Sequence, residues 1–304
     1  MFKLWEKPRA EEITMIAGWR QWADAGSMSS GLPQYLIDEM GAEKIGEFVN
    51  DGFYMFQIPG THDLVRPVVR MKDGYPEYIE ERTNELFYVG DGQKGLLIFL
   101  GDEPHMDIDR YAKTFFSVAK EVGVKRIISL GGVYGELPYD KERTISCLYS
   151  HPSIKAELEN YVVRFSGYQG GASVGSYLCK KAEQVHLEYI GFYAFVPTYD
   201  FSNATQQTQA QGIRIENDFV AWHGVMKRLN HMLNLEFDLT DLSLKAQKLI
   251  EVVDAKVEEL EREMPDMDIQ AYLERISAEF EEQTFMPLDD VWEEELRNLF
   301  DGLD

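Results

Sequence analysis

Residues 13–18 read Ile-Thr-Met-Ile-Ala-Gly, and the polar stretch Trp-Arg-Gln-Trp-Ala-Asp-Ala-Gly follows at residues 19–26. An apolar run of this length is typical of a strand that is buried on both faces of a sheet. The glycines that bracket the polar stretch predict a turn, and Ser27 is placed to cap a helix that reaches Met40. The segment therefore predicts a strand, a turn and a helix, which is the repeating unit of an α/β fold.

The same alternation returns further along the chain. Apolar runs predict strands at residues 95–100, 126–130, 161–165 and 189–196, and helical spacing of apolar residues predicts helices at 108–122 and 173–187. Alternating strands and helices indicate a mainly parallel sheet with helices on both faces, a three-layer α/β/α architecture. Between residues 44 and 90 the chain instead has short strand-like runs punctuated by turns, which predict antiparallel strands that extend the main sheet or are inserted into it; these runs are 45–49, 53–58, 65–69 and 86–89.

The last quarter of the chain differs in composition. Residues 236–304 hold 22 acidic and 6 basic side chains, which leaves −16 of the total net charge of −23. Helical spacing continues there, with helices predicted at 239–263, 268–280 and 288–300. We therefore predict two domains, an α/β core over residues 1–235 and an acidic helical extension over residues 236–304.

Charge and composition exclude several classes of function. A net charge of −23 repels phosphate backbones and anionic lipids, so neither a nucleic-acid nor a membrane partner is expected. No apolar run approaches the roughly 20 residues that span a bilayer, and the mixed polarity of the first residues does not resemble a signal peptide. The two cysteines, Cys147 and Cys179, fit neither a disulfide framework nor a zinc site. We expect a cytoplasmic protein with two buried thiols.

Four glycine-rich polar stretches follow predicted strands and predict a ligand site. They are residues 18–26, 101–105, 131–135 and 168–171. In a parallel sheet such turns gather at the carboxyl ends of the strands, where open α/β sheets bind ligands. Asp24 and Glu103 would supply carboxylates there, and they are candidate catalytic groups. The candidate pocket residues are Gly18, Trp19, Asp24, Gly26, Arg66, Gly101, Glu103, Gly131, Gly132, Tyr168, Gly170 and Gly171. The alternative is that the glycines only form turns and the carboxylates only cap helices.

A third catalytic candidate is Ser173. Residues 171–175, Gly-Ala-Ser-Val-Gly, match the G-x-S-x-G pattern of a nucleophile elbow between a strand and a helix. An acid and a histidine follow in the required order, namely Asp200 or Asp218 and then His223 or His231. The pattern is short enough to arise by chance, and Ser173 is equally suited to cap the helix that follows.

No cofactor or metal is expected from the remaining motifs. The chain has neither a P-loop nor a dinucleotide-binding glycine pattern, and its six histidines lack zinc-site spacing. His105 lies among Asp102, Glu103, Asp107 and Asp109, a composition that suits a metal ion. The dipole of a helix that begins there favours the same acidic residues, and this is the interpretation we prefer.

Several short motifs, taken in order, resemble the proteasome assembly chaperone 2 family. Gly18-Trp19 and Asp24-Ala25-Gly26 are similar to its Gly-Trp-x-Asp-Ala-Gly signature, although here three more residues separate the two parts. The other motifs that match are Arg66-Pro67, Gly101 with Glu103-Pro104, Leu130-Gly131-Gly132, Tyr168–Gly171, and Pro197 with Tyr199. Together, all these motifs span about residues 13–235.

The resemblance implies a phosphorylase/hydrolase-like α/β/α core and self-association into homo-oligomers. It also implies a role in assembling proteasome α-subunits, which some members perform through a hydrophobic-Tyr-x tail. This chain ends Leu-Phe-Asp-Gly-Leu-Asp at residues 299–304, so that docking route is not expected. Our first hypothesis is a non-enzymatic, oligomeric assembly or interaction protein. The alternative is an enzyme or binder of a small metabolite that uses the crevice at the strand ends.

Overall fold

The computed structural model describes residues 1–50, 52–58, 65–200, 212–265 and 268–285. The chain divides into two compact units. Unit 1 comprises Met1–Val133, Ser146–Lys155 and Phe165–Tyr193, and unit 2 comprises Tyr134–Ile145, Ala156–Arg164 and Ala194–Asp304. The predicted boundary after residue 235 falls between two helices of unit 2 and remains a prediction about independent folding. The predicted helix 288–300, the carboxyl-terminal tail and the turn at residues 59–60 lie outside the described residues.

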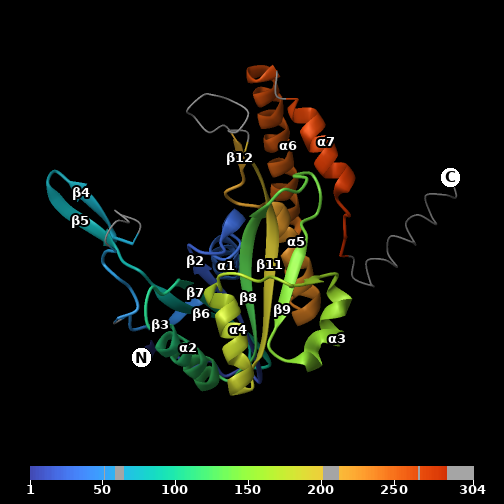
Figure 1. The fold of residues 1–304 in the computed structure, drawn as a ribbon. Helices are drawn as coiled ribbons and strands as arrows, with labels where there is room; N and C mark the ends of the chain where they lie inside the picture. Colours follow the sequence, from blue (N-terminus) through green and yellow to red (C-terminus); the bar gives the residue numbers. More distant parts are fainter. Residues whose placement is uncertain (51, 59–64, 201–211, 266–267, 286–304) are drawn as a thin grey trace. The chain divides into compact units, whose positions relative to one another are not determined.

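One ten-stranded sheet carries most of the strands (Figure 1). Its order is β1 (Phe2–Leu4), β3 (Glu43–Phe48), β6 (Asn84–Gly90), β7 (Lys94–Asp102), β2 (Glu12–Arg20), β8 (Val124–Gly135), β11 (Glu188–Asp200), β9 (Ile145–Tyr149) and β10 (Arg164–Phe165), with β12 (Gly212–Arg214) paired to β11. The strands β8 and β11 run from unit 1 into unit 2. A separate two-stranded sheet consists of β4 (Val68–Lys72) and β5 (Tyr75–Glu80).

The centre of the sheet is parallel. The strand β2 pairs in parallel with β7 on one side and with β8 on the other, so the carboxyl ends of all three strands lie at one edge. Pairing becomes antiparallel towards β1, where β7, β6, β3 and β1 succeed one another. The predicted antiparallel additions therefore extend the main sheet through β3 and β6.

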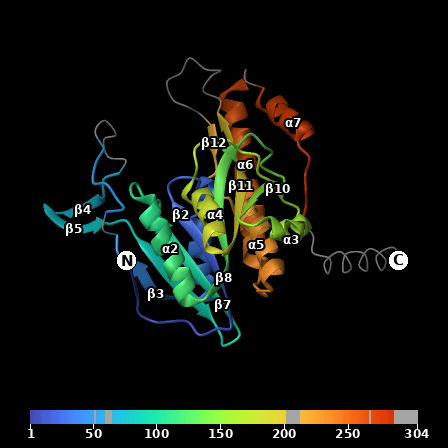
Figure 2. The same ribbon diagram turned by 60° about the horizontal axis from the view of Figure 1, so that its bottom comes forward.

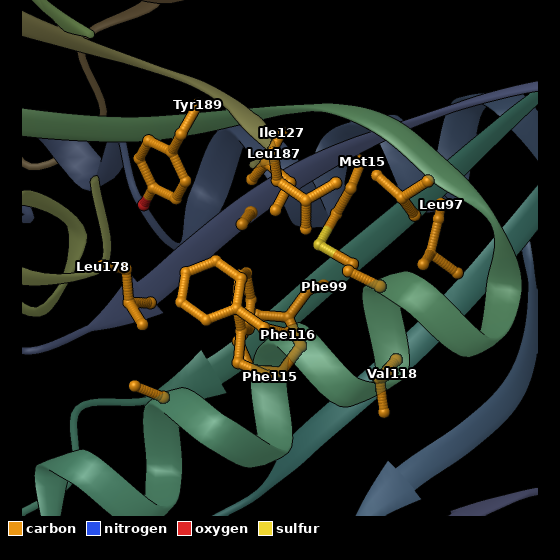
Figure 3. Close-up of a cluster of buried hydrophobic side chains, with 14 of the residues drawn as sticks. Met15, Leu97, Phe99, Phe115, Phe116, Val118, Ile127, Leu178, Leu187 and Tyr189 are labelled. Atoms are coloured by element: carbon orange, nitrogen blue, oxygen red, sulfur yellow. The ribbon is translucent and has the colours of Figure 1, made fainter. Parts of the chain in front are cut away.

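Helices cover both faces of the sheet in unit 1. The helices α2 (Ile108–Val122) and α4 (Val174–Val185) lie side by side on one face (Figures 1 and 2). Alternate strand residues such as Met15 and Phe99 point to this face and pack against Phe115 and Leu178 (Figure 3). The helix α1 (Gly31–Met40) lies on the opposite face, since Gly18 of β2 approaches Pro33 of α1 while its neighbours Ala17 and Trp19 pack in the cluster with α2. A methyl group on Gly18 would overlap the carbonyl oxygen of Ser29 just before α1, so only glycine permits this approach. The α/β/α class is confirmed.

Unit 2 contains the carboxyl-terminal helices α5 (Phe219–Leu233), α6 (Thr240–Glu263) and α7 (Ile269–Glu279), besides the short α3 (Lys155–Leu158) at its border. Here α6 packs along α5, and α7 packs against α6. Arg228 is fully buried and donates to the carbonyl oxygens of Tyr161, Val162 and Gly224, and burial lowers its pKa to about 10. Among the described residues, no helix has the length and the apolar character needed to cross a bilayer.

Several predicted elements differ from the structure. Residues 131–135 are the end of β8, not a turn, and residues 18–20 and 101–102 likewise belong to strands. Residues 53–58 form no strand, and the carbonyl oxygen of Phe53 accepts hydrogen bonds from the amides of His105 and Met106, just before α2. The strand predicted at 161–165 is reduced to two residues, since Val162 has φ 49° and breaks the extended backbone. The strand β11 continues past Pro197, because proline fits an extended backbone and removes only one donor.

Candidate functional site

A tight turn after β2, residues 21–27, lies against the end of β8. The amide of Gly132 donates to the carbonyl oxygen of Ala23 at 2.7 Å. A methyl group on Gly132 would overlap the carbonyl oxygen of Ala25, so glycine is required at this approach. The turn holds Gln21, Ala23 and Ser27 at positive φ, besides Gly26. Such left-handed residues persist only where surrounding contacts hold them. The four predicted glycine-rich stretches thus include one genuine turn that is bound to a neighbouring strand.

Asp24 is bound to the backbone that precedes α1. Its Oδ1 accepts from the amides of Ser29 at 2.8 Å and Ser30 at 2.9 Å, and its Oδ2 accepts from Ser30 Oγ at 2.6 Å. Burial raises the pKa of this carboxyl above its ordinary value, although the hydrogen bonds favour its charged form. The predicted cap at Ser27 is wrong: α1 begins after Ser30, and Asp24 binds the amides of Ser29 and Ser30, which precede the first helical residue.

Glu103 has the same kind of role at α4. Its Oε1 accepts from the amide of Val174, the first residue of α4, at 2.9 Å, and it also accepts from the backbone of Trp22. Burial raises the pKa of Glu103 despite these two hydrogen bonds. A carboxylate at the amino end of a helix is favoured by the helix dipole. Both candidate catalytic acids are therefore engaged by backbone amides, Asp24 just before α1 and Glu103 at the first residue of α4 and in the turn after β2.

Trp19 and Gly101 lie in the interior of unit 1. Trp19 is 2% exposed, and its Nε1 donates to the hydroxyl of Tyr111 at 2.8 Å. That hydroxyl donates to Asn84 Oδ1 at 2.7 Å, and Asn84 donates in turn to the hydroxyl of Tyr54. A side chain on Gly101 would overlap Asn84, which fixes this position as glycine. The Gly-Trp pair thus anchors a buried chain of hydrogen bonds beneath the sheet edge.

A pocket of about 290 Å³ opens beside this edge. Asp102 lines this pocket, and its side chain is 6% exposed. Its Oδ1 lies 3.1 Å from Arg82 Nη1. Its Oδ2 lies 3.5 Å from Arg20 Nη1 and accepts from the amide of Thr83 at 2.8 Å. The predicted pocket residue Arg66 also lines this pocket. The two arginines that face Asp102 were missed by sequence reasoning, since the parallel register that places Arg20 opposite Asp102 is a long-range property.

The remaining predicted pocket residues lie elsewhere. Gly131 is inside β8, where a methyl group would lie 2.5 Å from the ring of Tyr193. Tyr168 is 72% exposed, and its hydroxyl lies close to Gly170 and to the carbonyl oxygen of Gly171, within its own loop. The structure therefore gathers the first two predicted turns with Gly132, and it leaves the loop 168–171 as an exposed local turn.

Ser173 is the amino-terminal cap of α4. Its Oγ accepts from the amide of Ser176 at 3.2 Å and lies 2.9 Å from the hydroxyl of Tyr193, whose pKa burial raises to about 12. Its backbone is extended, with φ −73° and ψ 162°, unlike the strained turn of a nucleophile elbow. The proposed triad partners belong to unit 2, where Asp218 pairs with Arg143. These contacts are those of a capping serine, and nucleophilic reactivity of Ser173 stays a prediction.

The acids around His105 are directed to separate partners. His105 Nδ1 accepts from the amide of Met55 at 3.1 Å, Asp107 pairs with Arg110, and Asp109 pairs with Lys181. Within the described part of the chain, no group of three or more histidine, cysteine or acidic side chains is arranged to hold a metal ion.

Comparison with solved structures shows which proteins share this fold. A PAC2 family protein from Streptomyces avermitilis superposes with a TM-score of 0.65 at 21% identity, covering 80% of this chain and 95% of that chain. A proteasome-assembly chaperone homologue from Mycobacterium tuberculosis superposes with a TM-score of 0.67 at 17% identity, covering 80% of this chain and 94% of that chain. PbaB from Pyrococcus furiosus, an archaeal proteasome activator, superposes with a TM-score of 0.59 at 20% identity, covering 85% of this chain and 98% of that chain.

Sequence comparison gives the family. A search of curated proteins finds no significant match. The sequence profile of the PAC2 family, in contrast, matches residues 19–257, which is more than half of the chain and includes the turn after β2, the Asp102 pocket and α5. The chain therefore belongs to the PAC2 family.

Proposed function

We propose that this protein is a non-enzymatic interaction protein that assists the assembly of a multi-subunit protein complex and that itself self-associates. The observation that carries the proposal is that both candidate catalytic acids are hydrogen-bonded to backbone amides. Asp24 accepts from the amides of Ser29 and Ser30 just before α1. Glu103 accepts from the amide of Val174 at the start of α4 and from the amide of Trp22 in the turn after β2, so the hydrogen-bonding capacity of both acids serves the scaffold. Fixed carboxylates of this kind rigidify the strand ends, which suits a protein that presents surfaces to partners.

The relatives support the same class of function. Two structures with this fold come from proteins described as a proteasome-assembly chaperone homologue and an archaeal proteasome activator. Proteasome subunits are therefore the first clients to test. The acidic composition of residues 236–304 gives the chain a large surface for basic partners, and we infer a cytoplasmic site of action.

Assembly of proteasome α-subunits provides the test. Purified full-length protein is added below stoichiometry to isolated α-subunits, and ring formation is followed by native mass spectrometry. We expect faster ring formation and a transient complex that contains this chain. An unchanged rate with no complex would remove the proteasome as client. A charge-matched acidic control protein shows whether any acceleration is a non-specific effect of negative charge.

The pocket at Asp102 favours a second candidate, a binder of small anionic metabolites. Arg20, Arg66 and Arg82 line it together with the acidic residues Glu80, Glu81 and Asp102. Guanidinium groups bind carboxylates and phosphates in a bidentate manner. Thermal shift with phosphate, simple carboxylates and nucleosides tests this, because a ligand at 100 times its dissociation constant adds about 2.7 kcal/mol of stability. The shift should vanish in Arg82→Gln and persist in the exposed control Arg9→Gln; equal shifts in both variants would exclude this pocket.

A further inference from the structure

Two buried hydroxyl groups of unit 1 have no hydrogen-bond partner among the described residues. They are Ser129 Oγ on β8 and the hydroxyl of Tyr189 on β11. Ser129 is 1% exposed, and Tyr189 is fully buried at the margin of the apolar cluster (Figure 3). A buried hydroxyl without a partner loses its hydration and gains nothing in return, so folded proteins pair such groups with protein atoms or with ordered water. These two groups therefore indicate a bound molecule.

Both hydroxyls face the first turn of α4. A methyl group on Gly175 would lie 3.5 Å from Ser129 Oγ and 3.6 Å from the hydroxyl of Tyr189. The hydroxyl of Tyr193 is nearer still, at 2.6 Å from that methyl position, and it lies 2.9 Å from Ser173 Oγ. The second glycine of the Gly-Ala-Ser-Val-Gly motif is therefore required because hydroxyl groups gather beneath it.

Glycines in the strands let a tyrosine reach this position. Tyr189 and Tyr193 lie on the same face of β11, with Gly191 between them. A methyl group on Gly191 would lie 3.0 Å from the ring of Tyr193, and one on Gly131 of β8 would lie 2.5 Å from the same ring. The ring thus lies against both strands, and its hydroxyl extends to the start of α4.

The first turn of α4 also has an unbound backbone donor. The amide of Val174 donates to Glu103, and the amide of Ser176 donates to Ser173 Oγ. The amide of Gly175, between them, has no partner in the described part of the chain. The first amides of a helix have no partner within the helix and need one from elsewhere. The residue that the hydroxyls approach therefore has an unsatisfied donor of its own.

The surroundings select an uncharged occupant. Burial raises the pKa of Tyr189 well above its ordinary value, so its hydroxyl stays protonated. Burial and the nearby carboxylate of Glu103 both raise the pKa of Tyr193, to about 12. A buried anion would meet this carboxylate, and a buried cation would have only neutral hydroxyls as ligands, so either ion is costly here. Within the described residues, no cluster of histidine, cysteine or acidic side chains is arranged for a metal ion.

We propose that one water molecule is bound between Ser129 Oγ, the hydroxyl of Tyr189 and the first turn of α4 at Gly175. Water both donates and accepts, so it satisfies two hydroxyls and an amide at once, and about three hydrogen bonds are typical of an internal water. The molecule joins β8, β11 and α4, which are far apart in the sequence. This water site involves neither the proposed client nor the Asp102 pocket.

A high-resolution crystal structure of the full chain tests the water site directly. We expect electron density for one water at about 2.7–3.2 Å from both Ser129 Oγ and the hydroxyl of Tyr189. A direct hydrogen bond between these two hydroxyls, with no water density beside them, would overturn the proposal.

Relaxation dispersion of water ¹⁷O tests the site in solution, because its amplitude reports long-lived internal waters. The double variant Ser129→Ala/Tyr189→Phe removes both side-chain partners and should lose the amplitude of one molecule. The control is Ser150→Ala. Ser150 is also buried, but its Oγ has protein partners, since it donates to the carbonyl oxygen of Leu187 and accepts from the amide of Tyr189. The control should keep the wild-type amplitude; equal amplitudes in all three proteins, or an equal loss in both variants, would rule out this site.

The sign of a stability change gives a third readout. If the cluster is dry, Tyr189→Phe removes an unpaired hydroxyl and should leave the melting temperature unchanged or raise it. With the water bound, the same substitution removes a hydrogen bond and should lower the melting temperature by about 2 °C or more. Tyr111→Phe is the positive control, because the hydroxyl of Tyr111 has two protein partners, Trp19 and Asn84. A fall in Tyr111→Phe without a fall in Tyr189→Phe would show a dry cluster and refute the proposal.

Discussion

Replacement of Asp24 by alanine should destabilise unit 1, because this carboxylate holds the start of α1. The substitution removes the acceptor for the amides of Ser29 and Ser30 and for the hydroxyl of Ser30. Ser29 is 3% exposed, so water cannot replace the lost acceptor at its amide. Asp24→Asn retains one carbonyl oxygen in the place of Oδ1 and therefore keeps both backbone contacts.

The size of the effect follows from these contacts. An unsatisfied buried amide costs about 1–3 kcal/mol, and the partly exposed amide and hydroxyl of Ser30 add about 1 kcal/mol together. We expect Asp24→Ala to lose about 2–4 kcal/mol of unfolding free energy, or about 5 °C or more in melting temperature. Asp24→Asn should lose about 1 kcal/mol or less. Asp38→Ala, on the exposed face of α1, removes one side-chain hydrogen bond with Gln34 and should cost below about 0.5 kcal/mol.

Hydrogen exchange measured by mass spectrometry reads this effect locally. A peptide that covers residues 27–31 contains both amides that Asp24 binds, and its exchange should accelerate in Asp24→Ala but not in Asp24→Asn or Asp38→Ala. Chemical denaturation of the same variants gives the free energies. Alanine and asparagine variants of equal, wild-type stability would refute the capping role and return Asp24 to the list of free acids.

The pH dependence has a definite sign. Burial raises the pKa of Asp24 in the folded protein above its unfolded value, so the folded state holds the proton more tightly. The contribution of Asp24 to stability, measured against Asp24→Asn, should therefore grow as the pH falls towards 4 and shrink as the pH rises through the folded pKa to 7. A difference that grows towards pH 7 would contradict the burial argument.

Three further predictions concern other parts of the chain. Arg143→Met leaves the fully buried Asp218 carboxylate without its guanidinium partner and should lower the free energy of unfolding, measured by chemical denaturation, by about 3–5 kcal/mol. Adding Asp218→Asn should restore part of that loss. An Arg143→Met variant as stable as the wild type would contradict the pairing. Gly132→Ala should cost about 1–3 kcal/mol in a thermal melt, because the methyl group overlaps the turn after β2; an unchanged melting temperature would refute that close approach. Burial raises the pKa of Cys147 and of Cys179 to about 12, so neither thiol should react with a disulfide reagent at pH 8 until the protein unfolds; rapid labelling of the native protein would show the opposite.

Local signals predicted the helices better than the strand ends. The helix α2 spans Ile108–Val122 as its apolar spacing predicts, because Asp107 caps its start and Gly123 ends it in a left-handed conformation. Glycines misled the strand boundaries: at Gly131 and Gly132 a neighbouring chain segment approaches the strand closely, and sequence alone does not distinguish that cause from a turn. The strand β9 (Ile145–Tyr149) was not predicted.

The candidate site was predictable where it depends on local sequence and not where it depends on long-range contacts. Asp24 and Glu103 were found because they follow apolar runs. Asp24 binds the backbone just before the next helix, whereas Glu103 binds the first amide of α4, which is not the next helix along the chain. The pocket around Asp102 depends on Arg20 and Arg82, which come from different strand ends. Their meeting is fixed by strand order and register, which no short motif records.

Glu103 has one more consequence for any ligand at this edge of the sheet. Its carboxylate already occupies the amino end of α4, where a free phosphate or carboxylate would otherwise be attracted. The Glu103 carboxylate is tethered to the chain, so it competes with a free anion at an effective concentration of about millimolar or above. Dialysis cannot remove it. A free anion must exceed that concentration to bind α4, so the helix is in practice saturated with an internal ligand.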